Sequence, residues 1–203
     1  MENTKTVRSE IIFITGAPGT GKTTLANKIN EMSNNKYFLL SYDEIKEQFW
    51  DKFGFKSKKE KDELNEKALC YFYNKLDELM NKQINIITDY PFYQKHKVKL
   101  MELVINNKYV ASTILLYGDI DFVYKRFTDR NKGYDRHIGH LVNSYVPGKT
   151  DGTNIHTITK EQYLEDIYKK DYNIRLGETF EIDISKSPCE IRVSKWYAFF
   201  KYY

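Results

Sequence analysis

The 203-residue sequence is long enough for one domain with a substantial core, and its 30% charged and 41% hydrophobic residues are typical of a globular protein. No apolar stretch approaches the roughly 20 residues that cross a bilayer, and two cysteines are too few for a disulfide framework. The first ten residues lack an apolar signal core, so we expect a cytoplasmic protein. The formal net charge of +4 suits an anionic ligand without requiring nucleic acid.

Short apolar runs alternate with longer amphipathic segments along the chain. Apolar residues at helical spacing lie between the runs, most clearly from Lys59 to Asn81, and an aromatic stripe from Val193 to Tyr203 predicts a terminal helix docked on the core. Strands that alternate with helices predict an α/β fold with a parallel sheet and right-handed crossovers. The predicted strands are Ile11–Thr15, Tyr37–Ser41, Ile84–Thr88, Ala111–Tyr117 and Phe180–Ile184.

The first predicted strand leads into a glycine-rich loop, GAPGTGKT, which matches G-x-x-x-x-G-K-[ST] at every fixed position and precedes a predicted helix. Glycines let successive N–H groups turn inward around an anion, and the helix adds its positive dipole end. Lys22 would reach the β- and γ-phosphates, and the Thr23 hydroxyl would bind Mg²⁺. The residues that we predict to bind the nucleotide are Gly16, Ala17, Pro18, Gly19, Thr20, Gly21, Lys22, Thr23 and Thr24.

A carboxylate follows each of the next two predicted strands. Asp43 comes 21 positions after Lys22 and would lie near the γ-phosphate, where it could accept a proton from an attacking hydroxyl or merely cap the following helix. Asp89 could hold Mg²⁺ through water or contact the substrate hydroxyl. Tyr90 follows Asp89 where a hydrolytic motor of the AAA+ kind usually has a glutamate, which disfavours that class. An N-K-x-D element at Asn74–Asp77 falls inside a predicted helix, which disfavours a GTPase.

Arginine is rare in this lysine-rich chain, yet Arg126, Arg130 and Arg136 fall within eleven residues. The planar guanidinium suits two-point binding of phosphate, so we expect a phosphate-binding lid, with Arg136 on a mobile flap. The alternative is a solvated helix face with salt bridges to Asp129 and Asp135. His137 and His140 lack a third strong ligand, so we expect them to contact phosphate, base or substrate rather than a metal.

The loop, Asp43, Asp89 and the Arg126–Arg136 segment together resemble small P-loop kinases, in the group of polynucleotide 5′-hydroxyl kinases, zeta toxins and chloramphenicol phosphotransferase-like enzymes. The resemblance implies a three-layer P-loop NTPase fold. Its five-stranded parallel sheet, with the third strand beside the first, is flanked by helices and carries a helical lid at about 126–160 within a single domain, 1–203.

The same resemblance implies roles for individual residues. Asp43 would act as the base or orient the acceptor hydroxyl, with Lys46 at the position of a frequent arginine. Lid arginines contact the phosphates in this group, which makes Arg126, Arg130 and Arg136 the catalytic candidates beside Lys22 and Asp43. The segment FEIDIS followed by Pro188 is similar to the final strand and adenine-side loop.

We therefore predict an ATP- and Mg²⁺-dependent kinase that transfers the γ-phosphate to a hydroxyl, with Thr23 and Asp89 serving the metal. The acceptor would be a small molecule or nucleotide-type compound. Five lysines and two phenylalanines between Lys52 and Lys61 leave a nucleic-acid 5′ end open as the acceptor. A nucleotide-binding regulatory module with little turnover is a further alternative. The sequence does not distinguish ATP from GTP, and it does not identify the acceptor or the oligomeric state.

Overall fold

A computed structural model describes residues 8–133, 136–148 and 155–186 of the chain. Five strands form one all-parallel sheet in the order β2-β3-β1-β4-β5, with β1 at its centre. The third strand thus lies beside the first, as the resemblance implies. The strands are β1 (Glu10–Thr15), β2 (Phe38–Ser41), β3 (Ile86–Asp89), β4 (Val110–Tyr117) and β5 (Glu178–Asp183).

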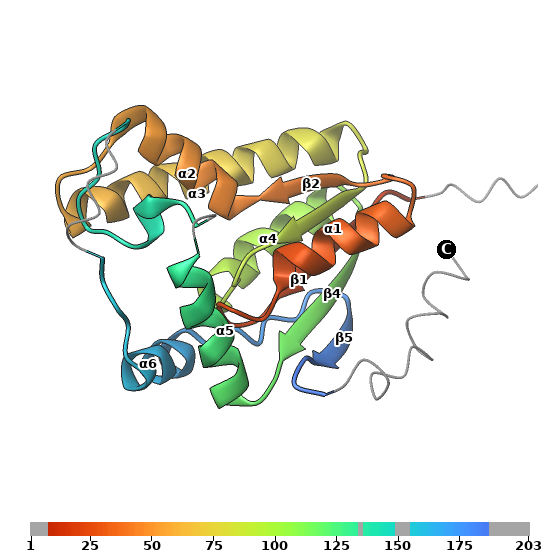
Figure 1. Cartoon of the computed structure of the whole chain (residues 1–203). Coiled ribbons are helices and arrows are strands. Elements are labelled where there is room, and N and C mark those ends of the chain that lie inside the picture. The colour runs from red at the N-terminus through yellow and green to blue at the C-terminus, as the bar shows by residue number, and fades with distance from the viewer. Residues whose placement is uncertain (1–7, 134–135, 149–154, 187–203) are drawn as a thin grey trace, which may run out of the picture.

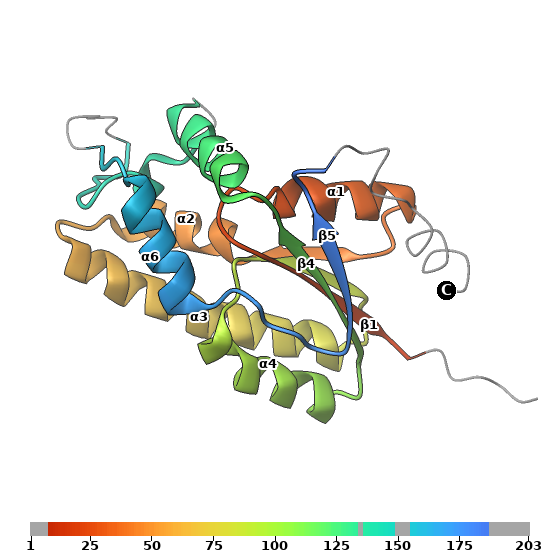
Figure 2. The same ribbon diagram turned by 90° about the horizontal axis from the view of Figure 1, so that it is seen from below.

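Helices cover both faces of the sheet and make it the middle of three layers. Figures 1 and 2 show α1 on one face, α3 and α4 on the other, and α5 and α6 beyond the carboxyl ends of the strands. A short 3₁₀ turn, η1 (Ile138–His140), lies between α5 and α6 in the chain. The helices are α1 (Lys22–Met32), α2 (Tyr42–Phe53), α3 (Lys58–Asn81), α4 (Gln94–Asn106), α5 (Ile120–Lys132) and α6 (Lys160–Lys170).

The central strand explains why the sheet is buried on both sides. Successive side chains of a strand point to opposite faces, and β1 is apolar at four positions in a row. Ile11 and Phe13 pack into the cluster formed with α3 and α4, whereas Ile12 and Ile14 pack into the cluster formed with α1. All four are at most 1% exposed, which holds the loop after β1 on a rigid base.

The predicted strands all form, with ends that differ by at most two residues. The last described helix, α6, begins with a capping box, because the Thr159 hydroxyl accepts from the Gln162 N–H and the Gln162 side chain accepts from the Thr159 N–H. The terminal aromatic stripe and Pro188 lie outside the described residues. In the part of the chain that the structure describes, no helix combines the length and the apolar character needed to span a membrane.

Candidate active site

The loop between β1 and α1 has a backbone that requires glycine at two points. Gly16 has a φ of +132° and Gly19 a φ of +96°. A Cβ at Gly16 would lie 2.1 Å from the Leu116 carbonyl oxygen, and one at Gly19 would lie 2.9 Å from the Phe127 Cβ. Because α1 begins at Lys22, its free N–H groups and positive dipole end stand directly behind the loop.

The Lys22 amine lies inside this loop. Its Nζ donates to the carbonyl oxygens of Gly16 and Ala17, each at 3.0 Å. Burial lowers the pKa of Lys22 from 10.5 to about 7, and the charges of Arg130 and Arg136 act in the same direction. The carboxylates that line the same cavity oppose this shift only in part. A buried, weakly held proton at this point favours an anionic ligand that would pair with the amine.

Asp89 ends β3 and lies beside the loop. The Thr23 Oγ1 donates to the Asp89 Oδ2 at 2.5 Å, and the Asp89 residue is 8% exposed. Burial raises the pKa of Asp89 to about 6, an effect that Asp43 increases and Lys22 reduces. A hydroxyl and a buried carboxylate are oxygen donors of the kind that Mg²⁺ prefers, so these two residues fit the ion.

Asp43 lies on the same edge of the sheet. Ser41 pairs in register with Asp89, and α2 begins directly afterwards at Tyr42. The N-cap position of α2 belongs to Ser41, so Asp43 occupies the first turn and does not cap the helix. Both carboxylates therefore reach the carboxyl-end edge of the sheet, where ligands bind in open α/β folds.

The Asp43 carboxylate is held in its ionised form by a lysine. Lys46 Nζ lies 2.6 Å from Asp43 Oδ1, and its side chain is only 12% exposed. Burial acts to raise the pKa of Asp43, but the cations Lys46 and Arg136 act against it, and that pKa lies well below its ordinary value. The Lys46 amine is itself enclosed by aromatic rings, at 5.1 to 5.6 Å from the ring centroids of Tyr42, Trp50 and Tyr90.

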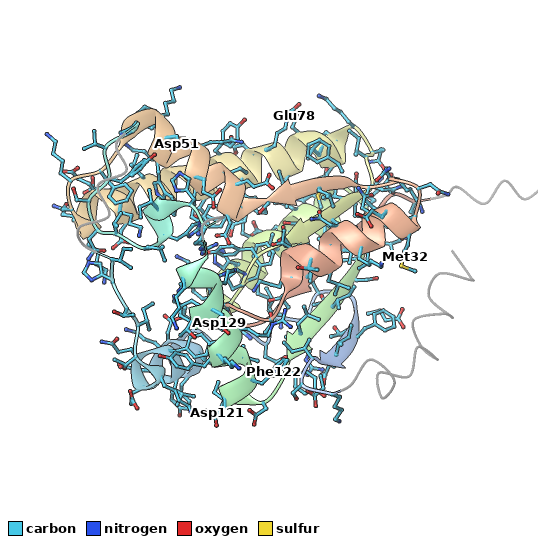
Figure 3. The ribbon with its side chains drawn as sticks, in the orientation of Figure 1. Met32, Asp51, Glu78, Asp121, Phe122 and Asp129 are labelled. Carbon is cyan, nitrogen blue, oxygen red and sulfur yellow. The ribbon has the colours of Figure 1, made fainter. Side chains whose placement is uncertain are left out.

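The three clustered arginines converge on one cavity. Arg126 and Arg130 extend from α5, and the Arg126 guanidinium comes within 3.2 Å of where a Cβ of Gly21 would stand. Burial and the charge of Arg130 lower the pKa of Arg136 to about 10, and the buried Arg136 Nε has no hydrogen-bond partner among the described residues. Among the described residues none of the three forms an ion pair with a carboxylate, so the salt bridge to Asp129 (labelled in Figure 3) is not formed. Asp135 lies outside the described residues.

One cavity of about 1060 Å³ is lined by the polar groups described above, namely Lys22, Thr23, Asp43, Lys46, Asp89, Arg126, Arg130 and Arg136. This volume lies at the upper end of the range of about 300 to 1,000 Å³ found for single small-molecule sites. The wall away from the loop carries α2, the β3–α4 connection and α6. The residues on this wall include Glu44, Glu47, Lys58, Tyr90, Tyr93, His140, Gln162, Asp166, Lys170 and Tyr172.

The sequence around this cavity matches a known protein family. A family model described as an AAA domain matches residues 12–140, which is more than half of the sequence. The chain belongs to the AAA domain family. The matched part of this AAA domain runs from β1 to the end of η1 and so contains the loop, Asp43, Asp89 and the three arginines.

Solved structures share the fold of this chain over nearly its whole length. A candidate kinase from Chloroflexus aurantiacus J-10-fl is 18% identical with a TM-score of 0.72, and the alignment covers 96% of this chain and 97% of that one. A sugar kinase from Janibacter sp. HTCC2649 is 10% identical with a TM-score of 0.54, covering 95% of each chain. A gluconokinase from Sinorhizobium meliloti 1021 is 11% identical with a TM-score of 0.51, covering 96% and 98%. A search of curated proteins gives no match. The AAA domain thus has the fold of small P-loop kinases.

His137 and His140 both bind carboxylates of α2. His137 Nε2 lies 3.0 Å from Asp51 Oδ1, and His140 Nε2 lies 2.6 Å from Glu47 Oε1, so both rings bind carboxylates of α2. His140 also borders the cavity. His137 is not a lining residue of the cavity, and the expectation that the two rings contact phosphate, base or substrate stays a prediction.

The segment that follows Arg136 packs against α2, and the expectation of a mobile flap stays a prediction. Residues 137–145 are hydrogen-bonded to α2 and to the α2–α3 connection, and Leu141 and Val142 are buried. The predicted lid at about 126–160 therefore includes a stretch that is fastened to the α2 side of the cavity. Sequence reasoning missed this contact, and it also missed the tyrosines of the far wall, Tyr93 and Tyr172, which follow no motif.

Proposed function

We propose that this chain transfers the γ-phosphate of ATP to a hydroxyl group of a small molecule or nucleotide-type acceptor. The observation that carries the proposal is the presence, in one cavity, of the buried Lys22 amine within its loop and the ionised Asp43 carboxylate. A phosphate-binding loop alone fits any nucleotide-binding protein, whereas a loop that faces a second, polar half-site fits a transferase. The cavity volume of about 1060 Å³ supports two substrates side by side.

The nucleotide half follows from the loop residues. The loop amides of Gly16–Thr24 would surround the β- and γ-phosphates, and Lys22 would exchange its two backbone carbonyl partners for phosphate oxygens. Thr23 and Asp89 would hold Mg²⁺, which would neutralise phosphate charge and orient the triphosphate. Arg126, Arg130 and Arg136 would stabilise the charge on the transferring group, since none of them has a carboxylate partner among the described residues.

The acceptor half depends on Asp43. A carboxylate whose pKa is held well below its ordinary value is a weak base, so Asp43 would mainly orient the acceptor hydroxyl and take its proton late. Phosphoryl transfer needs little covalent assistance, and orientation of the nucleophile is therefore sufficient for this role. Lys46 would keep Asp43 ionised through the 2.6 Å ion pair.

A nucleic-acid 5′ end is the second candidate acceptor. Lys58 lines the cavity and supports this version, because it adds a cation beside Lys46 on the acceptor wall. Lys61 donates inward to the Val142 carbonyl oxygen at 3.0 Å, so it is engaged within the fold. We therefore favour a small or nucleotide-sized acceptor. Binding that weakens steeply with salt would favour the nucleic acid instead.

The test is a screen for transfer of radiolabelled γ-phosphate to nucleosides, oligonucleotides, sugars and aminoglycoside-like compounds, with and without Mg²⁺. Asp43→Asn should lower turnover by about 10²-fold, the effect of a misplaced nucleophile, while the ATP dissociation constant changes little. Asp77→Asn is the matched control, because Asp77 accepts a hydrogen bond from Asn107 outside the cavity.

Two results would contradict the proposal. Full turnover in the Asp43 variant would remove the carboxylate from the reaction. ATP binding by the wild-type protein with no transfer to any acceptor would support the alternative of a regulatory module with little turnover.

A further inference from the structure

The sequence RHIGH at residues 136–140 has a counterpart on α2. Asp43, Glu47 and Asp51 are spaced by four residues, and side chains at this spacing share one face of a helix. The first carboxylate is the proposed acceptor-orienting group, and the next two each bind one histidine of the RHIGH segment. The same helix face therefore carries the reaction and the attachment of Arg136.

The hydrogen bonds of the two rings are directional. The Gly139 N–H donates to His137 Nδ1 at 3.0 Å, so the proton of the neutral ring lies on Nε2, which donates to Asp51. Burial lowers the pKa of His140 to about 4, so its ring is neutral near pH 7 and donates from Nε2 to Glu47. We call these two pairs, His137–Asp51 and His140–Glu47, the histidine clasp.

The buried Trp50 ring packs against both histidines. Its centroid lies 5.7 Å from that of His137 and 4.8 Å from that of His140. Trp50 is 1% exposed, and a Cβ on Gly139 would stand 2.4 Å from its Cε3. Only glycine lets the turn approach the indole so closely, and this contact fixes the position of the turn against α2.

The attachment continues beyond the clasp. Phe55 and Tyr145 exchange two backbone hydrogen bonds at 2.9 and 2.7 Å, and the Tyr145 hydroxyl donates to Asp51 Oδ1 at 2.6 Å. Figure 3 labels Asp51 on α2, on the side where the segment after η1 passes in Figure 1. Residues 137–145 are thus bound to α2 and the α2–α3 connection at several points, and His140 is the member of the clasp that lines the cavity.

We propose that His140 is a positioning residue that, through Glu47 and against Trp50, holds Arg136 opposite Asp43 before any substrate binds. The charges of Arg136 and Asp43 act on each other, and within the described part of the chain the buried Arg136 Nε has no hydrogen-bond partner. An arginine with an unpaired buried nitrogen needs an external restraint to keep its place, and the clasp supplies that restraint. This inference rests on the proposed function, because it assigns Arg136 and Asp43 to one reaction.

The experiment compares His140→Ala and Glu47→Ala, which break the clasp, with His140→Gln, whose amide can donate to Glu47 from nearly the same place as Nε2. Tyr37→Phe is the matched control, because it removes a buried 2.7 Å hydrogen bond to Glu10 far from the cavity. Each variant is measured for γ-phosphate transfer to the best acceptor of the screen, or to water, for the ATP dissociation constant, and for hydrogen exchange in residues 136–145.

We expect the two alanine variants to lose about 100-fold in kcat, the effect of a misplacement of about 1 Å, with an ATP dissociation constant within twofold of wild type. Exchange in residues 136–145 should rise at least about tenfold. His140→Gln should restore most of both properties, and Tyr37→Phe should leave kcat unchanged. Unchanged exchange, or equal loss of kcat in His140→Gln and His140→Ala, would overturn the proposal. Failure of the proposed function would instead appear in the wild-type protein, and the exchange data would still decide whether the clasp holds the segment.

Discussion

Replacement of Lys22 by methionine should stabilise the nucleotide-free protein while it removes nucleotide binding. The Lys22 residue is 8% exposed, and burial lowers its pKa from 10.5 to about 7. At about 1.4 kcal/mol for each pH unit, this difference corresponds to roughly 5 kcal/mol against the charged amine near pH 7. The hydrogen bonds to the Gly16 and Ala17 carbonyl oxygens offset about 1 to 1.5 kcal/mol each. The variant should therefore be more stable by about 2 kcal/mol.

Urea unfolding without nucleotide measures this difference, and its pH dependence tests the cause. Between pH 7 and 10.5 the folded lysine has lost its proton and the unfolded lysine retains it, so the stability of the wild type rises with pH. The advantage of the methionine variant should shrink by about 1.4 kcal/mol per pH unit and vanish near pH 9. Lys28→Met, at an exposed position of the same helix, should show no such trend. A Lys22 variant that is less stable than wild type at pH 7 would refute the reasoning.

Two further changes test the metal site and the turn. Asp89→Asn should reduce the gain in ATP affinity that Mg²⁺ provides, measured as the ratio of dissociation constants with and without chelator, because a neutral amide oxygen binds the ion more weakly than a carboxylate. An unchanged ratio would exclude Asp89 as a ligand. Gly139→Ala should lower the free energy of unfolding by about 1 to 3 kcal/mol, because its Cβ would stand 2.4 Å from Trp50. Gly133→Ala, at an ordinary φ of −73°, should change it by less than about 0.5 kcal/mol, and equal losses in the two variants would contradict the steric argument.

Local patterns were sufficient to predict the sheet and the loop. The inner strands β1 and β4 are apolar on both faces, so their runs are nearly continuous and their positions are visible in the sequence. The glycines of the loop follow from its local backbone geometry, because Gly16 and Gly19 both have positive φ angles. The NKLD segment, Asn74–Asp77, lies within α3 as expected, and its Asp77 binds Asn107.

The wall of the cavity away from the loop could not be predicted, because its residues come together only in three dimensions. Glu47 and His140 are 93 positions apart, and neither has a local pattern that names the other. The four-residue spacing of carboxylates on α2 was visible, but an amphipathic surface helix has the same pattern. The enclosure of Lys46 by Tyr42, Trp50 and Tyr90 likewise depends on how α2 packs on the β3–α4 connection.

One junction in this fold has no connecting residue: β2 ends at Ser41 and α2 begins at Tyr42, and both residues are buried. Asp43 is thereby connected to the sheet through the first turn of a helix, with no intervening loop in which residues could be inserted or deleted. Insertions and deletions are tolerated in surface connections rather than at such a junction. Diversification of this scaffold toward new acceptors would accordingly preserve Asp43 and proceed through exposed positions such as Lys58.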